Sequence, residues 1–316
     1  MRNVLNNILV TGTGGDSGLA TARILKDTPG YFVVSVDSSE NSTGLYFGDS
    51  KEIVPSAKNK EDFIKEVKTL VEKYEVKAIF PNVDEELKIF SDRDNFPQAI
   101  ISPTKTIEIC SDKLLTLQEL ESVIDVPEYK VLSELEVNQM KFPAIIKPRV
   151  SRGSKNIYLV KSHRELVALS LFLNENQNLD YESLLIQEYL PNKEYTVDCL
   201  FDFDGNYVLS VPRERVNTKG GISSVGQTVF DDRFEIIIRK IGKALKFNGP
   251  VNIQLKEDAN YKLKLMEINP RLSGGLPITH RAGINLPDLA YKLFMGEKIE
   301  KQKYKELKVF RYLNEA

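Results

Sequence analysis

Oxygen-bearing side chains gather in one segment near the C-terminal end of the sequence. In residues 251–256 apolar and polar residues alternate, as along a half-buried strand, and residues 263–268 form a second apolar run. A turn of about four residues would place Gln254 opposite Glu267 or a neighbour, with Asn269 on the same face. Amide and carboxylate oxygens are suitable ligands for a hard cation such as Mg²⁺. The alternative is a solvated polar sheet face, which is common in antiparallel sheets.

Two further segments carry cations beside glycines. Residues 269–275 read Asn-Pro-Arg-Leu-Ser-Gly-Gly, so Arg271 directly follows the expected metal ligands. Residues 213–224 contain two arginines, a lysine and a Gly-Gly pair, and Arg215 and Lys219 are the best candidates there for contact with an anionic substrate. Small residues beside a cation suit close approach to an anion. For the second segment, a solvated charged loop is the alternative.

A glycine-rich turn near the N-terminus indicates a different chemistry. Gly12, Gly14 and Gly18 follow an apolar run and Asp37 ends the next run, a pattern similar to a dinucleotide-binding fingerprint. The spacing is Gly-x-Gly-x-x-x-Gly, whereas the fingerprint has Gly-x-Gly-x-x-Gly, and such turns also serve plain packing of a helix on a sheet. An NAD-dependent oxidoreductase is therefore an alternative function.

Histidine and cysteine are scarce. His163 and His280 have no partner at metal-binding spacing, although His280 could line an acceptor site because it follows the metal segment. Cys110 and Cys199 are far apart in sequence, which is typical of buried thiols in a reducing compartment.

The elements that would position these residues change character along the chain. Over roughly the first 100 residues strands alternate with helices, which predicts a parallel sheet with right-handed crossovers. The predicted strands are residues 8–11, 31–37, 76–81 and 99–102, and the predicted helices are 19–26 and 60–73. A small α+β lobe and a larger lobe with the metal-site strands would follow.

Composition excludes several function classes. The chain has 43 basic and 45 acidic residues, so no long-range field points to nucleic acid or to an anionic membrane. No segment approaches the ~20 apolar residues that cross a bilayer, and residue 1 is not followed by a secretory leader. We therefore expect a cytoplasmic protein that meets charged small molecules with local charge.

Several separated motifs occur in a characteristic order. They read Phe-Pro-Ala-Ile-Ile-Lys-Pro-Arg at 142–149, Gln-Glu-Tyr-Leu at 187–190 followed by Glu194, and Gln254 with Glu-Ile-Asn-Pro-Arg at 267–271. Together they closely resemble the ATP-grasp superfamily, above all its carbamoyl-phosphate-synthase-large-subunit-like branch. Residues 81–87, Pro-Asn-Val-Asp-Glu-Glu-Leu, resemble part of the α/β domain that precedes the ATP-grasp unit.

The resemblance covers nearly the whole chain and implies its organisation. It implies an α/β and α+β protein, in which an N-terminal Rossmann-like parallel-sheet domain is followed by a two-lobed ATP-grasp fold. The N-terminal domain would span residues 1–103, the small lobe 104–187, and the large lobe 188–316 with the metal site.

The resemblance also implies an ATP site. Lysines would hold the phosphates as point charges. Backbone groups of a hinge between the lobes would form hydrogen bonds with the adenine edge, and Leu190 would pack on the adenine ring. Glu194 would accept hydrogen bonds from the ribose hydroxyls. The implied ATP-binding residues are Lys113, Lys147, Ser151, Gly153, Ser154, Gln187, Glu188, Tyr189, Leu190 and Glu194. Residues 150–156 would form a lid, where Ser151 and Asn156 replace glycines usual in this branch.

The implied function is an ATP- and Mg²⁺-dependent ligase, with Mn²⁺ as a possible substitute metal. It would join a carboxylate to an amine, or to a thiol, through an acyl phosphate, with an amino acid or a small peptide as the substrate. Gln254, Glu267 and Asn269 would hold the metal, and Arg271, Lys219 and Arg215 would be catalytic. The implied partners are small-molecule substrates and a second copy in a homodimer. Activation of bicarbonate or carbamate and a non-catalytic nucleotide sensor are the alternatives.

Overall fold

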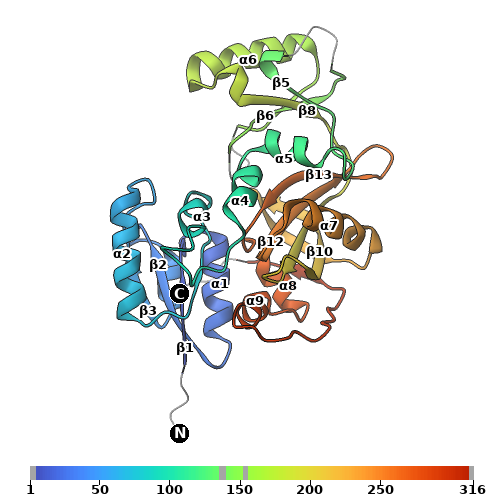
Figure 1. Ribbon diagram of the computed structural model, residues 1–316. Helices are drawn as coiled ribbons and strands as arrows, with labels where there is room; N and C mark the ends of the chain where they lie inside the picture. The colour runs from blue at the N-terminus through green and yellow to red at the C-terminus, as the bar shows by residue number, and fades with distance from the viewer. Residues whose placement is uncertain (1–4, 135–139, 152–155, 313–316) are drawn as a thin grey trace.

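The N-terminal part of the chain forms a parallel sheet with the strand order β3-β2-β1-β4 (Figure 1). The computed structural model describes residues 5–134, 140–151 and 156–312. The strands are β1 (Asn6–Val10), β2 (Tyr31–Asp37), β3 (Ser50–Ile53) and β4 (Ala78–Phe80). The helices are α1 (Asp16–Lys26), the 3-10 helix η1 (Thr43–Phe47), α2 (Lys60–Lys73) and α3 (Asp84–Phe90). The predicted parallel sheet is confirmed.

Both faces of this sheet are buried, because successive side chains of a strand point to opposite faces. Ile8 and Val10 belong to a core that also contains residues of α1 and of the C-terminal helices. Leu9 belongs to a second core on the other face, with Phe63 and Val67 of α2. One face of the N-terminal sheet is therefore covered by α2. The other face is covered by α1 together with the C-terminal helices.

Two strand predictions in this domain differ from the structure. Residues 99–102, predicted to be a strand, make one isolated parallel bridge, between Ala99 and Ile79. The segment then leaves the sheet, because Ser102 Oγ donates to the Asn248 carbonyl of the large lobe at 3.1 Å. The strand β3 was not predicted, since it is a half-exposed edge strand without an apolar run.

The second sheet belongs to a small lobe and is antiparallel, with the order β5-β8-β6-β7. Helix α6 covers it, at the top of Figure 1, and Leu166 and Leu173 of that helix enter its core. The strands are β5 (Tyr129–Val131), β6 (Ala144–Pro148), β7 (Tyr158–Val160) and β8 (Leu184–Glu188). The helices of this part are α4 (Thr104–Ser111), α5 (Lys113–Leu120), η2 (Leu132–Glu134), α6 (His163–Gln177) and η3 (Tyr181–Ser183).

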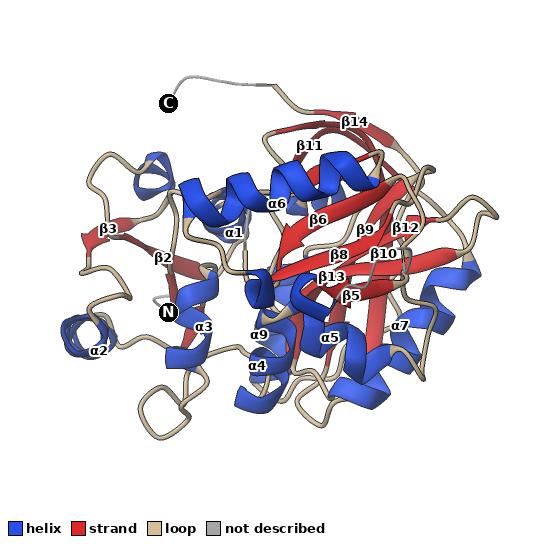
Figure 2. Cartoon of the chain, turned by 90° about the horizontal axis from the view of Figure 1, so that it is seen from above, coloured by secondary structure: helices blue, strands red, loops and turns tan. Residues whose placement is uncertain are grey.

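The third sheet forms the large lobe and has the order β13-β12-β9-β10-β11-β14 (Figure 2). Helix α7 packs on it through Phe234, Ile238, Ile241 and Leu245, whose spacing puts them on one face of the helix. The strands are β9 (Glu194–Phe201), β10 (Tyr207–Lys219), β11 (Ile222–Thr228), β12 (Gly249–Glu257), β13 (Leu263–Asn269) and β14 (Lys308–Phe310). The helices are α7 (Asp232–Leu245), α8 (Leu276–Arg281) and α9 (Leu286–Phe294).

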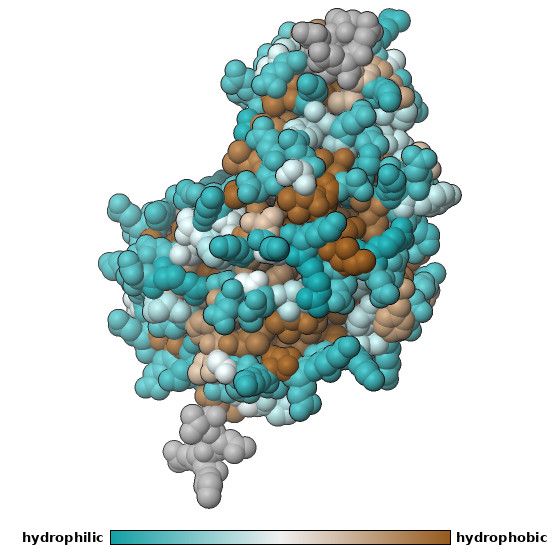
Figure 3. Space-filling view, turned by 45° about the vertical axis from the view of Figure 1, so that its right-hand side comes forward, coloured by the Kyte–Doolittle hydropathy of each residue, from teal (hydrophilic) through white to brown (hydrophobic). Residues whose placement is uncertain are grey.

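The observed architecture is the predicted fold class, an N-terminal parallel sheet followed by two antiparallel lobes. The division of the chain at residues 103 and 187 stays our proposal. One face of the molecule is mostly hydrophilic, with scattered hydrophobic residues (Figure 3). Among the described residues, every helix is too short or too polar to cross a bilayer.

Candidate functional site

The β12–β13 hairpin aligns the predicted metal ligands. Gln254 lies directly opposite Glu267, and Asn252 lies opposite Asn269. The register predicted from the alternation of apolar and polar residues is therefore confirmed at this pair. Asn269 Nδ2 donates to Glu267 Oε1 at 2.8 Å, so the carboxylate and the amide lie side by side. Within the described ranges no cluster of three histidine, cysteine or acidic side chains is placed for a metal, so this site has one carboxylate and two side-chain amides.

Two lysines approach Glu267 from the small lobe. Lys113 Nζ lies 3.9 Å from Glu267 Oε2 and donates to the Ser151 carbonyl at 3.0 Å and to Ser151 Oγ at 3.2 Å. Lys147, on β6, is buried, and this burial, followed by the nearby charge of Lys113, lowers its pKa to about 7. A carboxylate and two amines thus meet where the two lobes face each other.

The start of α5 fixes the position of Lys113. Asp112 caps the helix by accepting from the Leu114 backbone N–H at 2.8 Å. The same carboxylate accepts from Arg149 Nη2 at 2.6 Å, and the Lys113 N–H donates to the Arg149 carbonyl at 3.0 Å. Because Arg149 follows β6, these contacts tie Lys113 to the strand that carries Lys147.

The predicted adenine hinge lies at the end of β8. Gln187 is fully buried, and its Oε1 has no hydrogen-bond partner among the described residues. Glu188 pairs with Lys264 of the large lobe at 2.7 Å. Leu190 is buried, and the backbone groups of Tyr189 and Leu190 make no hydrogen bond within the described part of the chain. The hinge therefore presents unpaired backbone groups next to an apolar side chain.

Glu194 begins β9 and lies beside Arg215 of the neighbouring strand. Arg215 Nε is 2.8 Å from Glu194 Oε1, an ion-pair contact without hydrogen-bond geometry. Arg215 also donates to Thr196 Oγ1 at 3.2 Å and to the Gly221 carbonyl at 2.7 Å. Burial lowers the pKa of the Arg215 guanidinium. Arg215 is thus fixed by contacts at three points of the large lobe.

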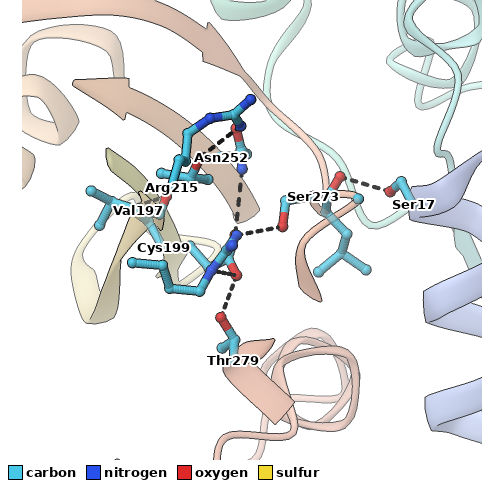
Figure 4. Close-up of polar contacts among 12 residues, drawn as sticks. Ser17, Val197, Cys199, Arg215, Asn252, Ser273 and Thr279 are labelled. Carbon is cyan, nitrogen blue, oxygen red and sulfur yellow. Dashed lines mark hydrogen bonds and ion pairs between the residues drawn. The ribbon is translucent and has the colours of Figure 1, made fainter. Parts of the chain in front are cut away.

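Arg213, two residues earlier on β10, forms a buried ion pair that was not predicted as a site. Its Nε and Nη2 donate to Asp198 at 3.1 and 3.0 Å, and both side chains are at most 2% exposed. Nη2 also donates to Ser273 Oγ at 3.0 Å. Figure 4 shows Ser273 and Thr279 meeting this pair, with Thr279 Oγ1 donating to Asp198. The Arg-x-Arg spacing was the available signal, because residues i and i+2 share one face of a strand.

Loss of Asp198 is expected to destabilise the fold. Asp198→Ala leaves Arg213 buried without its counter-charge, and we expect the free energy of unfolding to fall by about 3 kcal/mol or more in urea denaturation. The control is Glu235→Ala, which removes an exposed ion pair with Arg239 and should cost about 0.5 kcal/mol or less. Equal losses in the two variants would contradict the assignment of Arg213 as a buried charge.

Contacts across the domains fix Arg271. Arg271 Nε donates to Asp84 Oδ1 at 2.6 Å, and Asp84 begins α3 of the N-terminal domain. Ser17 Oγ lies 2.7 Å from the Leu272 carbonyl and 2.6 Å from Asn82 Oδ1, so α1 meets the same segment (Figure 4). The metal-site strand is therefore held against the N-terminal domain.

A cleft of about 660 Å³ lies between the N-terminal domain and the large lobe. The wall from the N-terminal domain is acidic, and the wall from the large lobe carries arginines and the metal residues. The charged lining residues are Asp16, Asp37, Lys58, Asp84, Glu85, Glu86, Glu194, Arg213, Arg215, Glu267 and Arg271. Gln254 and Asn269 line it as well, whereas Lys113 reaches Glu267 from the small lobe. Gln254, Glu267 and Asn269 thus lie between the two lysines of the small lobe and the cleft.

Three predicted residues stand apart from this arrangement. Lys219 is exposed at the end of β10 and does not line the cleft, although Gly220 and Gly221 of the same hairpin do. Gly153 and Ser154 lie outside the described residues. Their neighbour Asn156 has a φ of 57°, the left-handed conformation that asparagine tolerates better than most residues.

The glycine-rich turn after β1 is engaged in local packing. The Gly14 N–H donates to Asp37 Oδ2 at 2.7 Å, so this carboxylate binds its own loop. A Cβ at Gly18 would lie 2.2 Å from the Gly12 carbonyl oxygen, so α1 can approach β1 only with glycine there. These contacts explain the glycines and Asp37 without a dinucleotide.

Neither histidine lies in the cleft. His163 begins α6, and His280 lies on α8, where burial lowers its pKa and Nδ1 has no partner among the described residues. The two cysteines, Cys110 and Cys199, are free and buried.

Comparison with known proteins finds a family match for two separate parts of the chain. Residues 180–315 match a family described as ATP-grasp in the biosynthetic pathway with Ter operon. Residues 8–101 match the PylC-like N-terminal domain.

Curated relatives and solved structures agree with these matches. The carbamoyl phosphate synthase large chain of Clostridium perfringens (strain 13) is 26% identical over 176 residues, 52% of this chain and 16% of that protein. D-alanine–D-alanine ligase of Thermotoga petrophila is 28% identical over 186 residues, 54% of this chain and 57% of that protein. The L-amino acid ligase structure from Bacillus licheniformis has a TM-score of 0.70 at 16% identity, covering 92% of this chain and 74% of that one. The chain spans less than a fifth of the length of the carbamoyl phosphate synthase large chains and of the multifunctional protein URA2 of Saccharomyces cerevisiae that it matches.

Proposed function

We propose, from the premise that this chain is an ATP-grasp protein with a PylC-like N-terminal domain, that it joins a carboxylate to an amine using ATP. The reaction would pass through an acyl phosphate and use Mg²⁺. The observation that carries the proposal is the position of Gln254, Glu267 and Asn269. They lie between the lysines of the small lobe and the arginine-bearing cleft.

The residues around the hinge fit an adenine nucleotide. Lys113 provides positive charge for the phosphates, and Lys147 provides a buried amine that bound phosphates would keep protonated. The unpaired backbone of Tyr189 and Leu190 can bond the adenine edge. The buried, unpaired Gln187 Oε1 can accept from an exocyclic amino group. An adenine nucleotide would thus provide hydrogen-bond partners for these unpaired groups.

The metal residues fit Mg²⁺. This ion prefers oxygen ligands and is usually held by one or two carboxylates together with substrate phosphates. Glu267 supplies the carboxylate, and Asn269 and Gln254 supply amide oxygens after their side chains adjust. When bound, Mg²⁺ neutralises charge on the phosphates.

The charges of the cleft favour an amino acid or a small peptide as a substrate. An acidic wall faces a wall with Arg215 and Arg271, so a molecule with both an ammonium and a carboxylate group would meet opposite charge at each end. Bicarbonate or carbamate, the alternative suggested by the carbamoyl phosphate synthase relatives, gives no reason for the acidic wall. A thiol nucleophile gives none either.

The residues of the protein act by orientation and charge. The substrate carboxylate oxygen attacks the γ-phosphorus of ATP, the new C–O–P linkage forms, and the bond to the ADP oxygen breaks. Lys113, Lys147 and Arg271 stabilise the negative charge of this step, and Arg215 orients the acid. The role of Lys219 requires the β10–β11 hairpin to bend toward the cleft. We place the reaction in the cytoplasm, where the two free thiols would stay reduced.

An ATP-consumption screen tests the proposal. The protein is incubated with ATP, Mg²⁺ and pooled amino acids and carboxylates, and the mixture is analysed by mass spectrometry. We expect ADP and a condensation product only when an acid and an amine are both present. ADP formation without any condensation product would contradict ligation, and nucleotide binding without turnover would favour a sensor. A response to NADH would favour the oxidoreductase.

A further inference from the structure

One buried carboxylate in the cleft, Glu86, has no role in the chemistry described above. It lies in the first turn of α3, which follows β4, and Thr11 directly follows β1. In the order β3-β2-β1-β4, β2 and β3 lie on one side of β1, and β4 lies on its other side. The crevice at the carboxyl ends of β1 and β4 is therefore the point where the strand order reverses. Ligands of open α/β sheets bind at such points.

The carboxylate of Glu86 is held at one oxygen and open at the other. The residue is 7% exposed and lines the cleft. The buried Thr11 Oγ1 donates to Oε2, and within the described ranges this is the one side-chain partner of Glu86. Glu86 lines the cleft, and Oε1 is the oxygen that Thr11 does not engage. The hydrogen bond orients the side chain and leaves Oε1 without a side-chain partner within the described ranges.

The other carboxylates of this wall are engaged elsewhere. Asp37 accepts from the backbone of Gly14, and Asp84 pairs with Arg271. Burial is the largest influence on Glu86 and raises its pKa to about 8, the Thr11 hydrogen bond lowers it, and Asp37, Glu85 and Asp84 raise it further. A carboxylate in this range can accept a proton near neutral pH and release it again.

We propose that Glu86 is the base that removes a proton from the amine nucleophile, an inference that rests on the proposed ligase function. An amine arrives as an ammonium ion and cannot attack until it loses a proton. Oε1 takes this proton, and the nitrogen lone pair then forms the C–N bond to the acyl carbon. The C–O bond to phosphate breaks with its electron pair on the departing phosphate, which takes the second amine proton.

The test compares two nucleophiles in the variant Glu86→Gln. Hydroxylamine is uncharged near neutral pH and needs no base, so it captures the acyl phosphate as a hydroxamate. With the acid and amine identified in the screen above, we expect amide formation to fall about 10²-fold in kcat/KM while hydroxamate formation is unchanged. The wild-type amide rate should rise with pH near 8, and this rise should disappear in the variant. Glu52→Gln, outside the cleft, is the matched control and should change neither rate.

Each outcome bears on the assignment. Equal loss of amide and hydroxamate would overturn it, because a positioning or folding role affects both reactions. Undiminished amide formation would also overturn it. If the wild-type protein forms no hydroxamate with any acid, the ligase function itself fails, which is distinct from a failure of Glu86. Thermal unfolding checks folding, and the variant should be at least as stable as the wild type above pH 8, where burial of the ionised Glu86 carboxylate costs stability.

Discussion

Replacing Glu267 by alanine is expected to lower ATP-dependent turnover about 10³-fold while leaving the fold intact. Glu267 provides the one carboxylate of the metal residues on the β12–β13 hairpin, and its side chain is 26% exposed, so little packing is lost. Without it Asn269 and Gln254 offer only neutral oxygens, and the positive charges of Lys113 and Lys147 lose their nearby counter-charge. Turnover is measured by ADP release over a range of Mg²⁺ concentrations.

Two controls separate metal binding from other effects. Glu235→Ala removes an exposed carboxylate of α7 and should leave turnover unchanged. Excess Mn²⁺ or Mg²⁺ should restore Glu267→Gln only in part, because an amide oxygen binds the ion more weakly than a carboxylate. Near-normal turnover in Glu267→Ala at ordinary Mg²⁺ concentration would show that the metal lies elsewhere.

Replacing Lys147 by methionine is expected to lower kcat/KM for ATP by about 10²- to 10³-fold. Methionine retains the length of the buried side chain and removes only the charge that would meet the phosphates. The variant should be as stable as the wild-type protein without ATP. Burial disfavours the charged form of the Lys147 amine and lowers its pKa to about 7, so removing the amine removes an unfavourable contribution. Affinity for ATP is measured by calorimetry, and stability by urea denaturation.

The pH dependence of stability gives this variant an independent signature. The pKa of Lys147 is about 7 in the folded state and near its ordinary 10.5 when unfolded. The stability linked to this amine is fully present above 10.5 and is lost as pH falls toward 7. As the pH rises from 7 to 9, the free energy of unfolding of the wild-type protein should therefore increase relative to that of Lys147→Met. Parallel curves, or unchanged ATP affinity, would contradict the assignment.

The hairpin that carries the metal residues could be predicted because its periodicity is local. Strand alternation fixes which side chains share a face, and the short turn fixes which oppose each other, so Gln254 and Glu267 could be paired without a structure. The parallel N-terminal sheet could likewise be predicted from its alternation of strands and helices. In both cases one stretch of sequence contains all the information.

The features that escaped prediction depend on contacts between distant segments. The Arg213–Asp198 pair joins neighbouring strands and is completed by Ser273 and Thr279, so the Arg-x-Arg spacing could place Arg213 on the face of Arg215 but could not reveal its buried partner. Glu86 is one acidic residue among several in a helix start, and only the fold brings Thr11 against it. The strand predicted at residues 99–102 failed for the same reason, since the bond from Ser102 to Asn248 draws the segment away.

The core on one face of the N-terminal sheet has a consequence for how the molecule comes apart. Ile8 and Val10 share that core with Leu200 of the large lobe and with Leu286 and Leu289 of α9. The β5–β8 sheet and α6 instead share a separate core, whereas Cys110 of α4 and Leu120 of α5 belong to the core of the large lobe. The N-terminal sheet and the large lobe therefore form one cooperative unit, whose assembly must wait until α9 has been synthesised, while the β5–β8 sheet and α6 can open and re-form without disrupting the acidic and arginine walls.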